Sequence, residues 1–421
     1  MRIYTINIRD LYGGAGKAAN RIHQGLLAHG VNARMLVRDK QSDDNTVDLT
    51  VSGKLRRALS EIHPIIDRWP LRKYKNRKDV IFSTSLSSDN FVGKINAFKP
   101  DVVHMHWLNR GFFNIGYLKK IKAPVVISLH DMWTFTGGCH YNEECSRFTI
   151  GCGQCPLLGS NTVNDISSKQ FKRKQHIYSN LQNFTVVGLS RWMAQKAAES
   201  PLTRNAQVVN LPNGIDTSLY KPINKEVARD IFNLPKDKTM ILFGAMDATS
   251  DVRKGAKYLF DAVNSLNDKN IELMIFGSSN PPKGASFNLK ANYLGKINDE
   301  QLLAVLYSAA DLTIVPSLQE NLSNVIMESM ACGTPVAGFN IGGNSDMIVH
   351  EKTGYLAASV SAQALAKGIA DLCSQPNHLK ELGQNARQWV LQNFEIHKVV
   401  EQYIDLYSNI IRAAKAPGPA Q

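Results

Sequence analysis

The chain has 421 residues, 43% of them hydrophobic and 20% charged, and this length predicts two folded domains because it exceeds one typical core. No apolar run approaches the roughly 18 residues of a membrane-spanning helix. The formal net charge of +13 is uneven, with +15 in residues 1–214 and −2 in residues 215–421. The first half should therefore meet an acidic partner, such as anionic phospholipid or a lipid diphosphate. Nucleic acid is disfavoured, because no nucleic-acid motif is recognisable.

The N-terminal segment predicts folded structure. Residues 3–8 fit a buried strand, residues 13–16 a glycine-rich loop, and residues 17–29 a helix with one apolar face. The segment therefore does not fit a cleavable signal, and we expect a cytoplasmic protein. Backbone amides in such a loop can approach a phosphate or sugar closely, so Gly14 and Gly16 are candidate ligand-binding residues.

The same loop allows an alternative function. The pattern Gly14-x-Gly16-x-x-Ala19 fits a dinucleotide fingerprint, and Asp39 follows the next predicted strand, residues 33–37. A nicotinamide-dependent oxidoreductase is therefore the rival hypothesis. Four residues separate the first strand from the glycines, where the fingerprint requires a tighter turn, and this weakens the match.

Residues 54–78 hold the densest run of basic side chains, interleaved with apolar ones. Pro64 and Pro70 argue against one long helix. Apolar and aromatic groups beside Lys and Arg are typical of a segment lying on anionic lipid, so we predict peripheral binding to the inner face of the cytoplasmic membrane; a solvated basic face is the alternative. The basic residues are Lys54, Arg56, Arg57, Arg68, Arg72, Lys73, Lys75, Arg77 and Lys78, and the apolar ones are Leu55, Leu59, Ile62, Ile65, Ile66, Trp69 and Leu71.

Histidines follow two predicted strands. The strand in residues 100–109 carries His104 and His106 on one side, which we interpret as structural. The next strand ends in His130-Asp131. Ligand sites in parallel sheets lie beyond the carboxyl ends of the strands, which makes His130 a candidate site residue.

Four of the six cysteines form a cluster. Thiols at this density in a reducing compartment favour a tetrahedral structural zinc site over disulfides, with free thiols as a further alternative. The final C-x2-C has the usual chelate spacing, whereas the first two gaps are not standard. The cluster consists of Cys139, Cys145, Cys152 and Cys155, while Cys332 and Cys373 occupy apolar helical contexts and are expected in the core.

A helix predicted after the cysteines carries a second basic group, which we interpret either as part of the membrane or acceptor surface or as a solvated face. Its residues are Lys169, Lys172, Arg173, Lys174 and His176. Residues 210–222 are punctuated by Pro, Asn and Gly and predict the crossing into the second domain.

The second domain offers groups for an anionic ligand. A strand and a loop precede Arg253-Lys254-Gly255 and a helix, so these cations could hold a diphosphate. Further along, Glu320 lies in a turn after an apolar strand. Glu328 lies inside a helix that is apolar on nearly every face, where an ionised carboxylate needs a partner.

That helix is predicted to begin near Ser323 or Asn324 and to end at Gly333. Its first amides, with those of Asn321 and Leu322, would face an anion such as a pyrophosphate. A carboxylate along the helix can accept from both hydroxyls of a ribose. The alternative is a surface Glu320 and a structural Glu328.

Residues 309–357 resemble the donor-site signature of the retaining, GT-B-type glycosyltransferases of family 4. The resemblance rests on the two glutamates separated by seven residues, the following A-C-G-T-P-V, the Gly342-Gly343 turn and the T-G-Y-L strand entry. Residues 210–222 are similar to the family's P-N-G-I-D segment, and the strand before His130 is similar to its N-domain motif. The cysteines after His-Asp-x-Trp resemble a subgroup from bacterial exopolysaccharide and colanic-acid assembly.

The resemblance implies an α/β GT-B architecture of two doubly wound Rossmann-like domains facing across a cleft. Its domains would be residues 1–212 and 213–392, with a closing helix at 393–413 packing back on the first domain and a disordered tail at 414–421. The implied activity is transfer, with retention, of a sugar from a UDP- or GDP-linked donor to a glycan or lipid-diphosphate-linked acceptor in bacterial surface polysaccharide synthesis. No cofactor is implied for catalysis. A GT-B binding protein that has lost turnover is a third possibility.

The resemblance also assigns roles. His130 would contact the transferred sugar, Lys254 the diphosphate, Glu320 the sugar hydroxyls and Glu328 the ribose. The family normally carries an Arg after the strand glycine, where this chain has Gly244-Ala245-Met246, so Arg253 is a hypothetical substitute. The remaining implied donor-binding residues are Gly14, Gly16, Asn321, Leu322, Ser323 and Asn324.

Overall fold

The computed structural model describes residues 1–244, 251–277 and 287–415 and divides the chain into two compact units. Unit 1 comprises Met1–Gly214 and His397–Gln421, and unit 2 comprises Ile215–Ile396. The first boundary lies two residues after the predicted one. The two crossings run side by side, because Ile215 N donates to Phe394 O at 2.8 Å and Ile396 N donates to Ile215 O at 3.0 Å.

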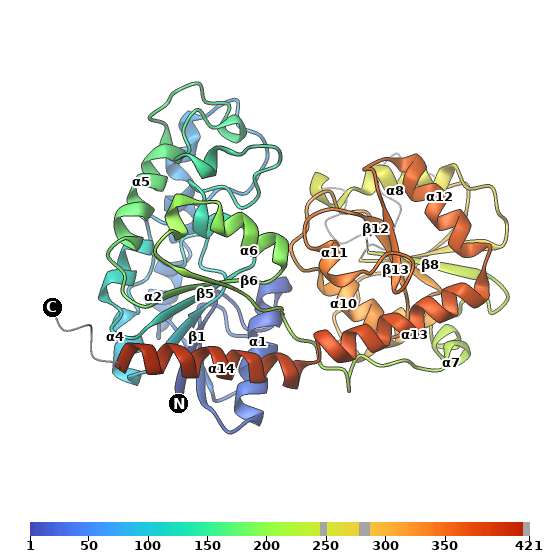
Figure 1. Cartoon of the computed structure of the whole chain (residues 1–421), viewed down its shortest axis with the longest axis horizontal. Coiled ribbons are helices and arrows are strands. Elements are labelled where there is room, and N and C mark those ends of the chain that lie inside the picture. Colours follow the sequence, from blue (N-terminus) through green and yellow to red (C-terminus); the bar gives the residue numbers. More distant parts are fainter. Residues whose placement is uncertain (245–250, 278–286, 416–421) are drawn as a thin grey trace. The chain divides into compact units, whose positions relative to one another are not determined.

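Unit 1 is built on a parallel seven-stranded sheet in the order β3-β2-β1-β4-β5-β6-β7 (Figure 1). Its strands are β1 (Arg2–Ile6), β2 (Asn32–Val37), β3 (Val47–Leu49), β4 (Val102–Met105), β5 (Val125–Leu129), β6 (Phe184–Gly188) and β7 (Gln207–Asn210). Its α-helices are α1 (Gly13–Ala28), α2 (Lys54–Ser60), α3 (His63–Arg68), α4 (Val92–Phe98), α5 (Ile166–Tyr178), α6 (Arg191–Ala198) and α14 (Ile396–Lys415), and its 3-10 helices are η1 (Trp69–Lys73), η2 (Ile115–Lys120), η3 (Trp133–Phe135), η4 (Arg147–Thr149), η5 (Pro156–Leu158) and η6 (Pro201–Thr203).

Unit 2 is built on a parallel six-stranded sheet in the order β10-β9-β8-β11-β12-β13. Its strands are β8 (Thr239–Gly244), β9 (Ile271–Phe276), β10 (Lys290–Tyr293), β11 (Leu312–Val315), β12 (Val336–Phe339) and β13 (Gly354–Ala357). Its helices are α7 (Lys225–Ile231), η7 (Val252–Lys254), α8 (Ala256–Asn264), α9 (Glu300–Ala309), α10 (Asn324–Ala331), α11 (Asn344–Met347), α12 (Ala362–Cys373) and α13 (Pro376–Asn393). Helices α8 and α12 lie on one side of this sheet, and α10 and α13 lie on the other (Figure 1).

The inner strands are apolar along their whole length because helices cover both faces of each sheet. Strands β5, β6, β9 and β11 are buried at every residue. The predicted pair of doubly wound α/β domains is therefore confirmed. Strand order reverses between β1 and β4 in unit 1 and between β8 and β11 in unit 2. At such switch points the loops leave the sheet in opposite directions and open a ligand crevice at the carboxyl ends of the strands.

Several predicted boundaries need correction. Helix α1 begins at Gly13, so the glycines at 13–16 form its first turn and not a loop before it. The predicted closing helix starts at Ile396, because Asn393 ends α13. Ala414 and Lys415 belong to α14 and not to a tail, and residues 416–421 lie outside the described residues. Helix α10 has Ser323 as its N-cap and is followed by Gly333 at φ +77°, as predicted.

Helix α14 belongs to unit 1 through two tyrosines. Tyr407 Oη bonds to His104 Nδ1 at 2.7 Å, and Tyr403 packs its ring on the same imidazole with 5.3 Å between centroids. His104 also bonds to Ser128 at 2.8 Å, which links β4 to β5. The side chains of Tyr403 and Tyr407 are fully buried. His104 is therefore structural, as the sequence predicts.

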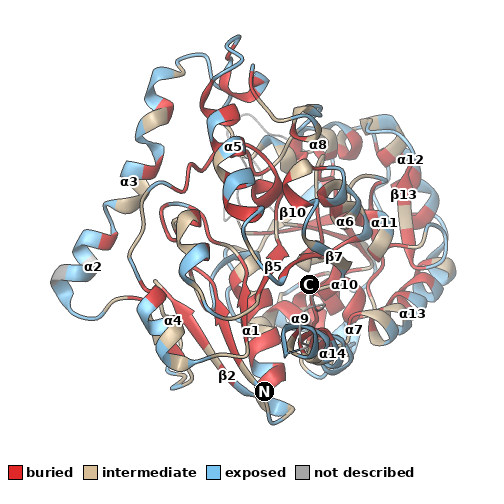
Figure 2. Cartoon of the chain, turned by 60° about the vertical axis from the view of Figure 1, so that its left-hand side comes forward, coloured by how far each residue is buried: buried red, intermediate tan, exposed pale blue. Residues whose placement is uncertain are grey.

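The basic and apolar segment is divided into α2, α3 and η1, with Pro64 and Pro70 in the first turns of the last two. Figure 2 shows α2 and α3 mostly exposed. Within the described ranges, no helix combines the length and the apolar character needed to cross a bilayer.

The second basic group is not one surface. Lys174 is buried and donates to the carbonyls of Trp133 and Thr136, and its ammonium lies 3.6 Å from the centre of the Trp133 ring. Arg173 donates to Ser85 O at 3.0 Å and to Asn114 Oδ1 at 2.6 Å. The interpretation of these two cations as part of an exposed face was wrong, because one side of α5 faces the interior along its whole length and both residues lie toward that side.

Candidate active site

The candidate site in unit 2 lies at the switch point between β8 and β11. Lys254 comes from the connection that follows β8, and Glu320 from the loop that follows β11. Lys254 Nζ donates to Glu320 Oε2 at 3.0 Å, and Ser317 Oγ donates to the same oxygen at 3.2 Å. The structure thus brings together two residues 66 positions apart that the sequence predicted for one ligand.

This ion pair sets the charge state of Glu320. Burial opposes ionisation, but the charges of Lys254 and Arg253 and the Ser317 hydroxyl outweigh it and lower the pKa of Glu320 below its usual value. The carboxylate is therefore ionised at neutral pH and accepts hydrogen bonds. An ionised carboxylate beside an ammonium suits the binding of hydroxyls next to an anion.

Two glycines allow the supporting backbones to approach closely. Gly255 has φ +66°, and a Cβ there would lie 1.9 Å from Pro316 O. Gly342 has φ +51°, and a Cβ there would lie 2.0 Å from Glu320 O. Leu318 N also donates to Arg253 O at 2.7 Å. The loops that carry Lys254 and Glu320 are therefore fixed against each other through their backbones.

Arg253 is already paired in this structure. Its guanidinium donates to Asp251 Oδ2 at 2.6 Å, one turn before Lys254. In the Gly244-Ala245-Met246 segment, where the resemblance predicts an Arg that this chain lacks, the residues after Gly244 lie outside the described ones. Arg253 still adds positive charge beside Glu320, so the hypothesis that it substitutes for that Arg stays a prediction.

The start of α10 lies next to this pair along the chain. Asn321, Leu322 and Ser323 are buried, and Ser323 Oγ accepts from Ile326 N at 3.5 Å. Asn324 is the first helical residue. The N-terminus of an α-helix carries partial positive charge, which suits an anion at this position.

Glu328 lies in the following turn of α10 and is 4% exposed. Tyr307 Oη of α9 donates to Glu328 Oε2 at 3.2 Å. The sequence predicts that a carboxylate inside this apolar helix needs a hydrogen-bond partner. The Tyr307 hydroxyl is one such partner and orients the Glu328 carboxylate. The ribose role of Glu328 remains a prediction.

In unit 1, His130 follows β5, one strand from the switch point between β1 and β4. His130 Nε2 shares a 2.9 Å hydrogen bond with His106 Nδ1. Desolvation lowers the pKa of His130 to about 4 although Asp131 opposes this, and it lowers the pKa of His106 well below the usual value. Both imidazoles are therefore neutral at physiological pH.

Asp131 organises the segment around His130. Its Oδ2 accepts from Trp107 Nε1 at 2.8 Å and from His140 Nδ1 at 2.6 Å, and its Oδ1 accepts from Trp133 N at 2.9 Å. Burial opposes its charge, but His140 and these donors lower its pKa below the usual value. Asp131 therefore fixes the backbone next to His130 as an ionised, fully bonded carboxylate.

Gly14 and Gly16 lie in the first turn of α1, beyond β1. A Cβ at Gly16 would lie 3.2 Å from Arg9 O, so a side chain there would crowd the preceding loop. Asp39, the acidic residue of the dinucleotide alternative, accepts from Arg9 Nε at 3.1 Å. That carboxylate thus takes part in an ion pair within the fold.

Sequence reasoning missed three supporting residues. Ser317 and Tyr307 bind the two glutamates, and His106, which we interpreted as structural, bonds to His130. The sequence could have indicated His106. It directly follows β4, just as His130 directly follows β5, so both histidines lie at the same edge of the sheet. No sequence pattern indicates Ser317 or Tyr307, because only the folded backbone brings their hydroxyls to the carboxylates.

Residues 224–389 match a family model described as "Glycosyl transferases group 1", and the match includes Lys254, Glu320 and Glu328. The match covers most of unit 2. Over a longer stretch, the chain is 28% identical over 337 residues to "D-inositol 3-phosphate glycosyltransferase 2" of Catenulispora acidiphila, covering 75% of this chain and 72% of that protein. These findings support a glycosyltransferase and favour it over the nicotinamide-dependent oxidoreductase.

Solved glycosyltransferases and related enzymes match nearly the whole chain in fold. Sucrose-phosphate synthase from Thermosynechococcus elongatus has a TM-score of 0.69 at 21% identity, covering 98% of this chain and 99% of that one. Anabaena Alr3699/HepE in complex with UDP-glucose has a TM-score of 0.65 at 15% identity, covering 97% and 100%. The likenesses confirm the predicted GT-B class of fold.

Proposed function

We propose that the glycosyltransferase is a retaining enzyme that moves a sugar from a UDP- or GDP-linked donor to a glycan or lipid-linked acceptor in the synthesis of a bacterial surface polysaccharide. The observation that carries the proposal is the Lys254–Glu320 pair at the switch point of the group 1 domain. A nucleotide-sugar donor also agrees with the UDP-glucose bound to Anabaena HepE.

The main chemical task is to stabilise the departing nucleoside diphosphate. Negative charge grows on its oxygens as the glycosidic bond breaks, and groups already aimed at that charge lower the barrier most. Lys254, with Arg253 beside it and the N-terminus of α10, supplies positive charge at one edge of the sheet. In this proposal the protein's own cations take the place of a catalytic divalent metal.

The two glutamates would bind hydroxyls and not attack carbon. Glu320 is held ionised by Lys254, which weakens it as a nucleophile and suits it to accept from the sugar hydroxyls. Glu328, oriented by Tyr307, would accept from the ribose hydroxyls. We propose that the acceptor attacks from the face that the diphosphate leaves, with a phosphate oxygen taking its proton, so that configuration is retained.

His130 would contact the transferred sugar. A neutral imidazole binds hydroxyls without adding charge to the reacting centre, and the low pKa of His130 keeps it neutral. His106 holds the ring through the 2.9 Å bond and thereby limits its tautomers. Backbone amides in the first turn of α1, which contains Gly14 and Gly16, would donate hydrogen bonds to the donor or acceptor phosphates.

The acceptor side of the proposal is supported by an exposed apolar and basic face on unit 1. Leu59, Ile62, Ile65, Ile66 and Trp69 are 43–63% exposed, which is unusual for five large apolar side chains within one short segment. The exposed cations Lys54, Arg56, Arg68, Arg72 and Lys73 share the segment. We propose that this face binds an anionic membrane and brings the enzyme to a lipid-linked acceptor.

Donor binding tests the proposal directly. Unfolding temperatures are measured with UDP- and GDP-sugars for the wild type and for Glu328→Ala, with Glu381→Ala on the exposed face of α13 as the matched control. We expect one donor class to raise the unfolding temperature of the wild type and of the control, because a ligand of the native state stabilises it. Glu328→Ala should lose most of that shift. An equal shift in all three proteins would reject the ribose role.

Turnover and stereochemistry complete that test. The stabilising donor, incubated with acceptor mixtures and no added Mg²⁺ or Mn²⁺, should yield nucleoside diphosphate and a product with the anomeric configuration of the donor, read by NMR. Donor binding without either glycosyl transfer or donor hydrolysis would instead identify a binding protein. An inverted product would overturn the retaining mechanism.

Vesicle flotation tests the membrane face. We expect binding to phosphatidylcholine vesicles that contain phosphatidylglycerol, weaker binding to pure phosphatidylcholine, and loss of binding at high salt. Ile65→Glu should weaken flotation by at least tenfold, because it adds charge to the inserted face and removes an apolar group. Ile231→Glu, at a similarly exposed position on α7, should have no effect. Equal flotation of both variants would refute a membrane role for this face.

A further inference from the structure

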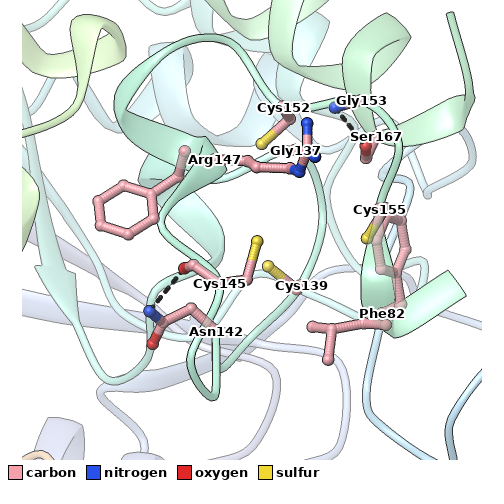
Figure 3. Close-up of a pocket in the computed structure, with 12 residues that line it drawn as sticks. Phe82, Gly137, Cys139, Asn142, Cys145, Arg147, Cys152, Gly153, Cys155 and Ser167 are labelled. Carbon is pink, nitrogen blue, oxygen red and sulfur yellow. Dashed lines mark hydrogen bonds between the residues drawn. The ribbon is translucent and has the colours of Figure 1, made fainter. Parts of the chain in front are cut away.

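The four clustered cysteines of unit 1 surround one small cavity. Cys139, Cys145, Cys152 and Cys155 all line a space of about 20 Å³, together with the rings of Phe82 and Phe148 (Figure 3). All four are free thiols. A volume of roughly 10–15 Å³ holds one water molecule, so this cavity has room for a single ion or water. Hydroxyl or carboxylate groups would suit a water, whereas four thiols suit a soft metal ion.

Backbone amides lie close to two of the sulfurs: those of Leu157 and Leu158 near Cys155, and that of Gly137 near Cys152. Burial outweighs these amides and raises the pKa of the thiols, so Cys139, Cys152 and Cys155 are protonated in this structure. In a metal site, such outer donors orient the ligands and offset their negative charge.

The backbone from Gly151 to Gln154, just before the last cysteine, is held in a costly conformation. Cys152 has φ +59° and Gln154 has φ +44°. Gly151, which precedes Cys152, and Gly153, which lies between the two residues, also have positive φ. Non-glycine residues adopt this left-handed conformation only where the surroundings hold them. Here the turn between Cys152 and Cys155 places both side chains at one cavity, as the C-x2-C spacing of a metal chelate requires.

Neighbouring segments close around this loop. Gly153 N donates to Ser167 Oγ at 2.9 Å, and Cys155 N donates to Asp165 Oδ2 at 2.9 Å, which ties the loop to the start of α5. Lys174 of the same helix is buried and lies within electrostatic range of Cys139 and Cys152. A zinc ion with four thiolates carries a net charge of −2, which the ammonium would partly neutralise.

We propose that Cys139, Cys145, Cys152 and Cys155 bind one structural Zn²⁺ ion. In the part of the chain that the structure describes, no three His, Cys, Asp or Glu side chains are already arranged closely enough to hold a metal ion, so the four sulfurs must move closer together to reach Zn–S distances of about 2.3 Å. Rotation about χ1 moves a cysteine sulfur without moving its backbone. Binding converts four thiols to thiolates and releases four protons, which makes affinity rise with pH.

The proposed site also bears on His130. His140 directly follows Cys139. Its Nε2 shares a 2.9 Å hydrogen bond with Ser83 Oγ, and its Nδ1 donates to Asp131 Oδ2 at 2.6 Å. A zinc ion that fixes the cysteine loop would therefore fix His140 and, through Asp131, the segment that carries His130. These cysteines are structural in this account and touch neither donor nor acceptor.

Metal content tests the proposal independently of turnover. The full chain, purified from zinc-supplemented medium and dialysed, should contain about one zinc per chain by plasma mass spectrometry, and Cys155→Ser should lose most of it. Cys373→Ser removes a buried thiol from unit 2 and should keep one zinc. Zinc-free wild type, or equal zinc in both variants, would overturn the proposal, as would native disulfides detected as a mass lower by two per bond.

A second measurement covers the case in which Cys155→Ser fails to fold. Thiol labelling of the native wild type should leave the four cluster cysteines protected, and a chelator should release zinc and expose them while lowering the unfolding temperature. Added Co²⁺ should then give the absorption bands of a tetrahedral thiolate complex. Protection that a chelator does not change would reject the site. Because these readouts need no donor, their failure leaves the glycosyltransferase proposal untouched.

Discussion

Replacing Lys254 by alanine is expected to lower kcat by about 10²–10³-fold, the usual effect of removing one preorganised group that stabilises a developing anion. The ammonium belongs to unit 2, where it bonds to Glu320 at 3.0 Å at the switch point of the sheet. The loss should appear in kcat more than in KM, since the charge on the diphosphate grows as the bond breaks. The measurement is steady-state release of nucleoside diphosphate.

Lys257→Ala is the matched control. Lys257 is exposed one turn away in α8, and its loss removes the same charge without touching Glu320, so activity should stay near that of the wild type. Lys254→Ala also leaves a buried carboxylate without its ammonium, so its unfolding temperature and donor-induced shift should be recorded. A folded Lys254→Ala with kcat within threefold of the wild type would show that this cation does not act on the leaving group.

Gly255→Ala is expected to abolish most activity by a different route. The new Cβ would meet Pro316 O at 1.9 Å in a backbone at φ +66°, so either the Lys254 turn or the loop leading to Glu320 must move. An L-residue in the left-handed region costs about 1–2 kcal/mol by itself, and the displaced backbone adds to this. We expect a fall in kcat/KM of at least tenfold and a lower unfolding temperature.

Gly30→Ala separates the cost of the left-handed backbone from the effect of the steric clash. Gly30 has φ +72°, but a Cβ there meets no atom within 4 Å, so this variant carries the conformational cost without the clash. It should lower the unfolding temperature slightly and leave kcat/KM unchanged. Equal effects of the two substitutions on activity would mean that the close approach between residues 255 and 316 does not position the ion pair.

Much of the fold was predictable because it follows from local patterns. Buried strands such as residues 33–37, the N-cap Ser323 and the turn at Gly333 each follow from residue types a few positions apart. The start of α1 was wrong because three glycines lower helix propensity, whereas tertiary packing of the helix outweighs this cost.

The candidate site was only partly predictable for a related reason. Lys254 and Glu320 carried enough local context to be singled out, but their direct contact depends on the order β8-β11 in the sheet, which no local pattern encodes. The interior positions of Lys174 and Arg173 were missed because a charge in a helix is usually solvated. The His106–His130 bond was missed because it joins neighbouring strands that are 24 residues apart.

The two buried tyrosines of α14 have a consequence for synthesis of the protein. Tyr403 and Tyr407 complete the interior beside His104, yet they are translated after the whole of unit 2. The first unit therefore cannot finish folding while the nascent chain is still being elongated through unit 2. A fragment that stops at Gly214 would leave that apolar surface uncovered, so it should depend on chaperones or aggregate.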